Sequence, residues 1–149
     1  MRVSVIGGSD VDEETYESAR ELGQLLAAGG HEVVCGGLGG VMEGVCRGVK
    51  ERDGRTIGIL PGSDRSAANP YVDTAIATGM GNARNTLVVL NGDAVVAIDG
   101  STGTLSELGL ALDYGRPVAG LDTLRIEGID GIEHVETPQA AAEYVESVF

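Results

Sequence analysis

The segment with the clearest chemical potential runs from Ala94 to Glu107 and reads Ala-Val-Val-Ala-Ile-Asp-Gly-Ser-Thr-Gly-Thr-Leu-Ser-Glu. An apolar, β-branched run ends in a turn of small residues, and the pattern then predicts a helix over Leu105–Tyr114. The free N–H groups and the positive dipole end of that helix would face the carboxyl end of a buried strand. Such a turn suits an anion, above all a phosphate, and its glycines let a ligand approach the backbone.

The same residues also fit a purely structural interpretation. Thr104-Leu-Ser-Glu107 matches a capping box, in which the Glu107 carboxylate folds back onto the start of the helix. The spacing alone does not separate a phosphate-binding turn from a helix cap, so both interpretations stay open at this point.

Strand and helix patterns alternate along the whole chain. Strands are predicted at Arg2–Ile6, Glu32–Cys35, Thr56–Leu60, Val72–Ala77, Ala94–Ile98 and Val118–Leu121. Helices are predicted at Asp12–Ala28, Val41–Arg52, Gly79–Val89, Leu105–Tyr114 and Pro138–Val148. The segment Leu124–Val135 is ambiguous, because its isoleucines are spaced by three residues around Gly and Asp. Ser63–Asn69 is polar and irregular, as expected of a lid or rim.

This alternation predicts a single α/β domain over residues 1–149, with a Rossmann-like, mostly parallel sheet and helices on both faces. In such sheets ligands bind beyond the carboxyl ends of the strands. The small and polar residues gather after the predicted strands, in the segments Gly7–Asp10, Gly36–Gly40, Pro61–Asp64 and Asp99–Thr104.

The charge of the chain is strongly one-sided. Its formal net charge is −13, with 23 acidic residues against 10 basic ones, of which Lys50 is the only lysine. An excess of acid with so little lysine is expected of a protein adapted to a salt-rich cytoplasm, and an ordinary acidic enzyme is the alternative. Either interpretation disfavours a nucleic-acid partner, which would need a basic surface. No apolar run is long enough to span a membrane, so we expect a cytoplasmic protein with no membrane partner.

Cysteine and histidine give little sign of metal chemistry. Cys35 and Cys46 each lie in an apolar segment and are expected to be packed, reduced thiols. His31 and His134 are isolated from other ligand-type residues, so no protein-bound metal is predicted. The chain also lacks G-x-x-x-x-G-K-[ST], G-x-G-x-x-G and G-x-S-x-G, which disfavours a P-loop NTPase, an ordinary NAD or FAD site and an α/β-hydrolase.

Three segments, taken in order, resemble a known superfamily. Asp99-Gly-Ser-Thr-Gly-Thr-Leu-Ser-Glu107 is similar to its signature Pro-Gly-Gly-x-Gly-Thr-x-x-Glu. Cys35-Gly-Gly-Leu-Gly-Gly-Val-Met42 is similar to its Gly-Gly-Gly-x-x-Gly-Leu-Met turn, and Met80-Gly-Asn-Ala-Arg84-Asn85 loosely resembles its Met-x-x-Arg-Lys helix start. The chain thus resembles the Lonely Guy (LOG) and "lysine decarboxylase-like" Rossmann proteins, which are related to DNA-processing protein A. Its length and third motif most resemble the small branch that includes molybdenum-cofactor carrier proteins.

The resemblance implies two different functions. LOG-type enzymes hydrolyse the N-glycosidic bond of nucleoside 5′-monophosphates, and their essential Arg and Glu map onto Arg84 and Glu107. The alternative is a non-catalytic carrier or sensor, which would hold a signalling nucleotide or the phosphate of a pterin such as the molybdenum cofactor. No further cofactor is required by either function. The residues implied to bind the ligand are Gly8, Ser9, Gly36, Gly37, Gly39, Gly40, Met42, Gly100, Ser101, Thr102, Gly103 and Thr104.

The resemblance also implies a homodimer or larger homo-oligomer, and it has three notable departures. Asp99 replaces the Pro of the signature, Ser101 replaces its second Gly, and Asn85 replaces the Lys that follows the Arg. Asp99 would place a negative charge near the expected phosphate unless it points away or pairs with Arg84.

Overall fold

The computed structural model describes all residues from Met1 to Phe149 as one α/β domain built around a seven-stranded sheet. All strand pairs are parallel, in the order β4-β3-β2-β1-β5-β6-β7. The strands are β1 (Arg2–Gly7), β2 (Glu32–Cys35), β3 (Thr56–Leu60), β4 (Thr74–Ala77), β5 (Ala94–Ile98), β6 (Val118–Leu121) and β7 (Ile132–Val135).

Five α-helices and two short 3-10 helices connect these strands. The α-helices are α1 (Glu13–Ala28), α2 (Val41–Lys50), α3 (Asn85–Leu90), α4 (Thr102–Asp113) and α5 (Pro138–Ser147). The 3-10 helices are η1 (Arg65–Ala67) and η2 (Gly81–Arg84). None of the helices is both long and apolar enough to cross a membrane.

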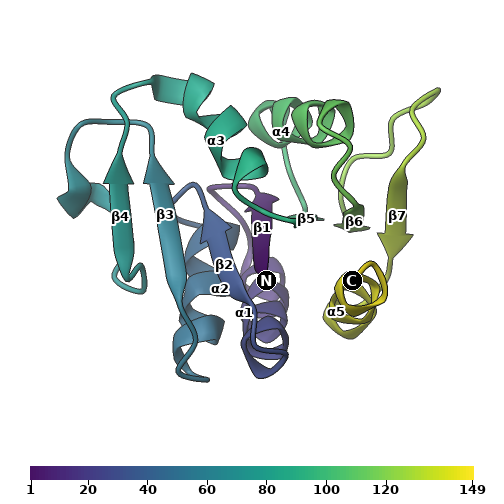
Figure 1. Cartoon of the computed structure of the whole chain (residues 1–149), viewed down its shortest axis with the longest axis horizontal. Coiled ribbons are helices and arrows are strands. Elements are labelled where there is room, and N and C mark those ends of the chain that lie inside the picture. The colour runs from purple at the N-terminus through teal and green to yellow at the C-terminus, as the bar shows by residue number, and fades with distance from the viewer.

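The helices form two layers, as predicted. Figure 1 shows α3 and α4 on one side of the sheet and α1, α2 and α5 on the other. Successive residues of each central strand point into opposite cores, as the two-residue period of a strand requires. In β5, Val96 packs in the core beneath α1, α2 and α5, whereas Val95 and Ala97 pack with Val88 and Leu108 beneath α3 and α4. The uninterrupted apolar pattern of β5 is therefore explained by burial on both faces.

Local sequence explains where two of the helices start. Asp12 caps α1 by accepting a hydrogen bond from the Thr15 amide at 2.8 Å. Thr137 caps α5 by accepting from the Ala140 amide at 3.1 Å, and Pro138 occupies the first helical position as predicted.

Besides shifts of one or two residues at the ends of β1, α1, α2 and α5, four differences separate the predicted elements from the observed ones. The helix predicted over Gly79–Val89 is divided into η2 and α3, and the strand predicted from Val72 begins only at Thr74. The ambiguous segment contributes β7, a short and partly exposed edge strand. The most consequential difference concerns α4, which begins at Thr102 rather than Leu105.

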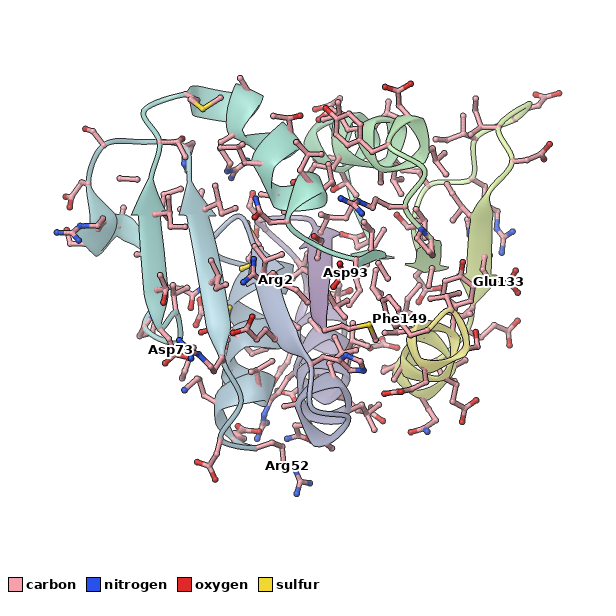
Figure 2. The ribbon with its side chains drawn as sticks, viewed as in Figure 1. Arg2, Arg52, Asp73, Asp93, Glu133 and Phe149 are labelled. Atoms are coloured by element: carbon pink, nitrogen blue, oxygen red, sulfur yellow. The ribbon has the colours of Figure 1, made fainter.

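The strand order places a switch point between β1 and β5. The chain builds β1 to β4 outward in one direction and β5 to β7 in the other, so the loops after β1 and β5 diverge and leave a crevice between them. The opposite edge is closed by polar contacts. Arg2 and Asp93 are both labelled in Figure 2. The Arg2 backbone amide donates to the Asp93 carboxylate at 3.0 Å, and the Asp93 amide donates to the Arg2 carbonyl at 2.7 Å. The fold therefore leaves room for a ligand in the crevice at the carboxyl ends of β1 and β5.

Candidate ligand-binding site

A cavity of about 160 Å³ lies at the switch point between β1 and β5. Its walls come from the loop after β1, the loop between β2 and α2, η2 with the start of α3, and the first turns of α4. The lining residues are Gly7, Gly8, Ser9, Leu38, Met42, Asn82, Arg84, Asn85, Ser101, Gly103, Thr104 and Glu107. This volume is below the few hundred Å³ usual for a pocket that encloses a whole ligand. The cavity is therefore the right size for one end of a ligand, such as a phosphate group.

Arg84 is the only buried arginine or lysine of the structure and lines this cavity. Its Nε donates to the Ile59 carbonyl at 2.9 Å, and its Nη1 donates to the Asn85 side-chain oxygen. Burial lowers the pKa of the guanidinium from its ordinary value, but an arginine stays protonated in proteins. No carboxylate forms an ion pair with it. The remaining N–H donors are therefore available to an anion in the cavity.

Glu107 is the second buried ionisable group of the cavity. Only 8% of its surface is exposed, and its carboxyl accepts no hydrogen bond from another protein group. Burial raises the pKa of Glu107 to about 7, against the opposing effect of the Arg84 charge. Near neutral pH this carboxyl is therefore divided between a protonated form, which can donate to a ligand oxygen, and an ionised form, which repels an anion.

The start of α4 does not form the predicted capping box. Ser101 is the N-cap residue and makes no capping hydrogen bond with its side chain, while Thr104 already lies in the first helical turn. Glu107 lies further along the helix, on its buried side, so it cannot fold back onto the helix start. The capping interpretation is therefore wrong. The first-turn N–H groups of α4, next to Ser101 and Gly103 in the cavity wall, remain free of any side-chain cap.

Asp99 adopts a backbone conformation that the signature Pro could not adopt. Its φ is +53°, whereas proline is fixed near −65°. The Asp99 carboxylate does not pair with Arg84 but lies against Gly8, where an added Cβ would be 3.1 Å from its Oδ2. It belongs to a separate hollow that also includes Asp12, the N-cap residue of α1, and Glu14 in its first turn. Its charge is therefore adjacent to the cavity but directed towards α1.

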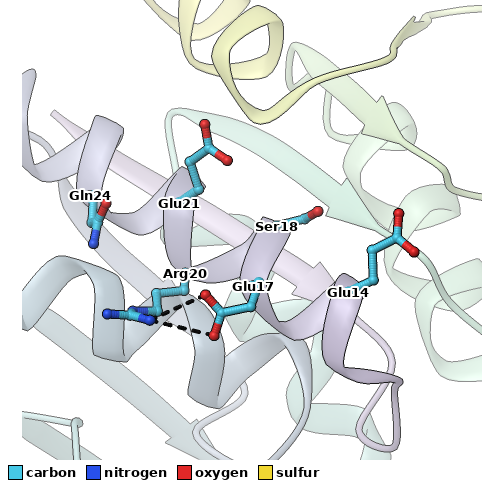
Figure 3. A pocket seen from close by; sticks show the side chains of 6 residues that line it. All are labelled: Glu14, Glu17, Ser18, Arg20, Glu21 and Gln24. Atoms are coloured by element: carbon cyan, nitrogen blue, oxygen red, sulfur yellow. Dashed lines mark hydrogen bonds and ion pairs between the residues drawn. The ribbon is translucent and has the colours of Figure 1, made fainter.

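A larger surface hollow on α1, of about 550 Å³, has no features of a phosphate site (Figure 3). Its lining residues are Glu14, Glu17, Ser18, Arg20, Glu21 and Gln24. Arg20 is already paired with Glu17 at 3.2 Å and with Glu51 at 2.9 Å. Three carboxylates and one satisfied guanidinium disfavour an anion, so we assign no ligand to this hollow.

Comparison with known proteins places this architecture in a family. The model of the SLOG cluster4 family matches residues 1–148, which is nearly the whole chain. The chain belongs to the SLOG cluster4 family. This membership confirms the resemblance to the LOG and SLOG superfamily of Rossmann-like proteins, whose fold DNA processing protein A also shares.

Full-length relatives of this SLOG protein are similar in sequence and structure. A protein of Archaeoglobus fulgidus is 42% identical over 97% of this chain and 93% of its own. The molybdenum cofactor binding protein of Rippkaea orientalis has a TM-score of 0.92 and 34% identity, covering 99% of this chain and 96% of its own. The molybdenum cofactor carrier protein of Chlamydomonas reinhardtii has a TM-score of 0.90 and 30% identity, covering 99% and 97%.

The structure of the SLOG protein brings together half of the residues predicted to bind a ligand. Arg84 and Glu107, predicted as catalytic, also line the cavity. The predicted ligand-binding residues in the lining are Gly8, Ser9, Met42, Ser101, Gly103 and Thr104. Those outside it are Gly36, Gly37, Gly39, Gly40, Gly100 and Thr102. The candidate site is therefore more compact than the motifs suggest.

Two of the glycines outside the lining shape the cavity indirectly. A Cβ on Gly36 would lie 2.8 Å from the Arg84 Nη2, so this glycine makes room for the guanidinium. Gly40 has a φ of +63°, and a Cβ there would lie 2.3 Å from the Gly8 carbonyl oxygen. That close approach lets the Val41 amide donate to Gly8 at 3.0 Å and joins the loops after β1 and β2.

Sequence reasoning missed Gly7, Leu38, Asn82 and Asn85 as lining residues of the SLOG site. Gly7, Leu38 and Asn82 lie within or beside the quoted motifs. Their closeness to those motifs in the sequence could have indicated that they belong to the site. Asn85 was noted only as a departure from the family pattern. Its contact with Ser106 depends on how α3 packs against α4, which no local pattern reports.

Proposed function

We propose that this SLOG protein is a carrier of a small phosphorylated ligand, with the molybdenum cofactor, a pterin phosphate, as its cargo. The observation that carries the proposal is the buried Arg84, which lines a small cavity beside the uncapped start of α4 and has N–H donors that no protein group accepts. The likeness over nearly full length to the binding and carrier proteins of R. orientalis and C. reinhardtii supports the pterin as cargo.

The shape of the site also supports partial enclosure of the cargo. A cavity of about 160 Å³ accepts a phosphate group and leaves the remainder of the ligand over the open rim. Phosphate oxygens would accept hydrogen bonds from Arg84 and from the first-turn amides of α4. A ligand held at one end can be passed on without opening the domain, as a carrier requires.

A direct test measures what the protein retains. The protein would be produced in a bacterial host that makes molybdenum cofactor, and the purified material would be assayed for molybdenum by mass spectrometry and for pterin by fluorescence after oxidation. We expect both in the wild type, little of either in Arg84→Met, and retention in Arg125→Met, which alters an exposed arginine outside the cavity. A folded wild type that takes up neither, even when mixed with cofactor released from a molybdoenzyme, would contradict the carrier proposal.

Hydrolysis of nucleoside 5′-monophosphates is the second candidate, and one observation favours it. Arg84 and Glu107 line the same cavity and form no ion pair, so a phosphate near Arg84 would leave the ribose of a nucleotide within reach of Glu107. In that reaction the ionised Glu107 would stabilise an oxocarbenium-like ribosyl group or orient water. Chromatography of the free base released from nucleoside 5′-monophosphates measures this activity. Turnover that is lost in Glu107→Gln would support the enzyme, and turnover that survives the change would exclude Glu107 as the catalytic group.

We also propose that two copies associate through the outer face of α3 and α4. No residue of α3 is charged, and in α4 only Asp113 accompanies the buried Glu107. Leu90, Leu105 and Tyr114 are nevertheless 37–44% exposed on this layer. Because each copy carries a net charge of −13, two copies repel each other least where charge is absent.

Light scattering of the eluting protein tests this association. We expect a dimer for the wild type and a monomer for Leu105→Glu. The matched control is Ile76→Glu, which adds the same charge at an equally exposed position on β4. A wild type that is monomeric at high salt and high concentration would contradict the proposed interface.

A further inference from the structure

Asn85 links the buried cation of the site to the first turns of α4. Its side-chain oxygen accepts a hydrogen bond from the Arg84 Nη1, and its Nδ2 donates to the Ser106 Oγ at 3.1 Å. Ser106 in turn donates to the Gly103 carbonyl at 2.7 Å. Asn85 is only 5% exposed, so its amide has little access to water, whereas Ser106 lies at the surface. A continuous chain of hydrogen bonds therefore runs from the guanidinium to the anion-facing end of α4.

This chain fixes which donors of Arg84 face the cavity. The planar guanidinium has five N–H groups in a rigid fork. Nε is committed to the Ile59 carbonyl and one Nη1 donor to Asn85, while Nη2 lies over Gly36. Two fixed anchors on one plane leave the guanidinium a single orientation. We propose that Asn85 is the positioning residue of this site, which orients Arg84 towards an anion and locks it to α4.

The residue type matters because both anchors of Arg84 are neutral. A carboxylate at position 85 would hold the guanidinium equally well but would neutralise its charge, and a lysine would place a second buried cation beside it. An amide accepts from Arg84 and donates to Ser106 simultaneously, so it orients the cation without consuming its charge. The family pattern has Lys at this position. In this chain Asn85 carries no charge of its own and instead orients the Arg84 guanidinium. The inference rests on the proposed function only for the identity of the anion.

Three variants test the role by affinity for inorganic phosphate and adenosine 5′-monophosphate. Asn85→Leu is close in volume and removes both hydrogen bonds, and we expect affinity to fall about tenfold or more, the loss usual for a hydrogen bond to a charged group. Asn85→Asp keeps the acceptor for Arg84 but pairs with its charge, and should also bind more weakly. Tyr114→Phe is the matched control, because it removes the 2.5 Å bond between Thr86 and Tyr114 that also ties α3 to α4. We expect it to change affinity less than about twofold.

A second measurement does not need a ligand. NMR of the arginine side-chain nitrogens reports whether a guanidinium rotates, and Arg84 is the one buried arginine. We expect its Nη signals to be distinct in the wild type, in Asn85→Asp and in Tyr114→Phe, and averaged in Asn85→Leu. Averaging in Tyr114→Phe, or distinct signals in Asn85→Leu, would overturn the positioning role. Failure of the folded wild type to bind any phosphate ligand would instead contradict the proposed function and leave this spectroscopic test intact.

Discussion

Replacing Glu107 by Gln should stabilise the protein, and the gain should grow as the pH rises from 4.5 to above 7. Glu107 is buried, has no hydrogen-bonding partner in the protein, and has its pKa raised to about 7. An ionised carboxylate at this position opposes folding, whereas the protonated acid does not. The amide of Gln is close in shape to the protonated acid and carries no charge at any pH.

The size of the effect follows from the two pKa values. The unfolded chain has an ordinary value near 4.5 and the folded chain a value of about 7. Because the folded value is the higher one, the contribution of this carboxyl to stability is fully present below pH 4.5 and is lost as the pH rises through 7. At about 1.4 kcal/mol per pH unit, the difference amounts to about 3 kcal/mol. For a domain of this size that is roughly 6–12 °C in melting temperature.

Urea unfolding of both proteins at pH 5 and pH 8, in the same molar salt, measures this directly. We expect the gain in free energy of unfolding to be less than about 1 kcal/mol at pH 5 and about 3 kcal/mol at pH 8. Glu21→Gln is the control, because it removes the same charge from the exposed surface of α1 (Figure 3) and should add little at either pH. A stability difference that is equal at pH 5 and pH 8 would refute the reasoning from burial.

Three further outcomes are expected. Gly48→Ala should destabilise by about 2 kcal/mol in urea unfolding, because its Cβ would lie 1.9 Å from the Arg20 carbonyl, whereas Gly109→Ala, with open space around it, should be neutral or stabilising. The melting temperature should fall when salt is reduced from molar to tens of millimolar, since 23 acidic residues then repel over a Debye length of up to ~30 Å; an unchanged melting curve would make this an ordinary acidic protein. Adenosine or guanosine monophosphate should raise the melting temperature and the corresponding nucleosides should not, and equal shifts would argue against a phosphate cradle.

The sequence alone predicts the layered architecture, because local patterns of apolar residues indicate each strand and helix. The predicted bounds of β2, β3, β5 and β6 match the observed strands, and only β7 could not be assigned. Edge strand β7 is short and half-exposed, so it lacks the continuous apolar run that marks the buried strands. Periodicity reports burial, and it fails where burial is incomplete.

The site was less accessible to sequence reasoning because two of its features depend on distant packing. Ser101, Thr102 and Gly103 all suit a turn as well as a helix start, so the composition did not reveal that α4 begins at Thr102. Because α4 begins three residues earlier than predicted, Glu107 cannot be the cap that the sequence left open and is instead a buried carboxyl of the cavity. The role of Asn85 depends on Ser106, 21 residues away on another helix, and only the folded chain brings them together.

Asp99, which stands where the family signature has Pro, bears on the proposed carrier function. Proline cannot adopt the φ of +53° observed here, whereas Asp tolerates the left-handed region, so the turn after β5 follows a path of its own. The Asp99 carboxylate then lies beside Gly8 at the cavity edge, and Glu107 stands inside the cavity with a pKa of about 7. One oriented cation and one helix end thus attract an anion, and the ionised form of Glu107 inside the cavity opposes it. Ionisation of Glu107 would weaken the hold on an anion, and such a site suits a protein that must pass its cargo on, as proposed above.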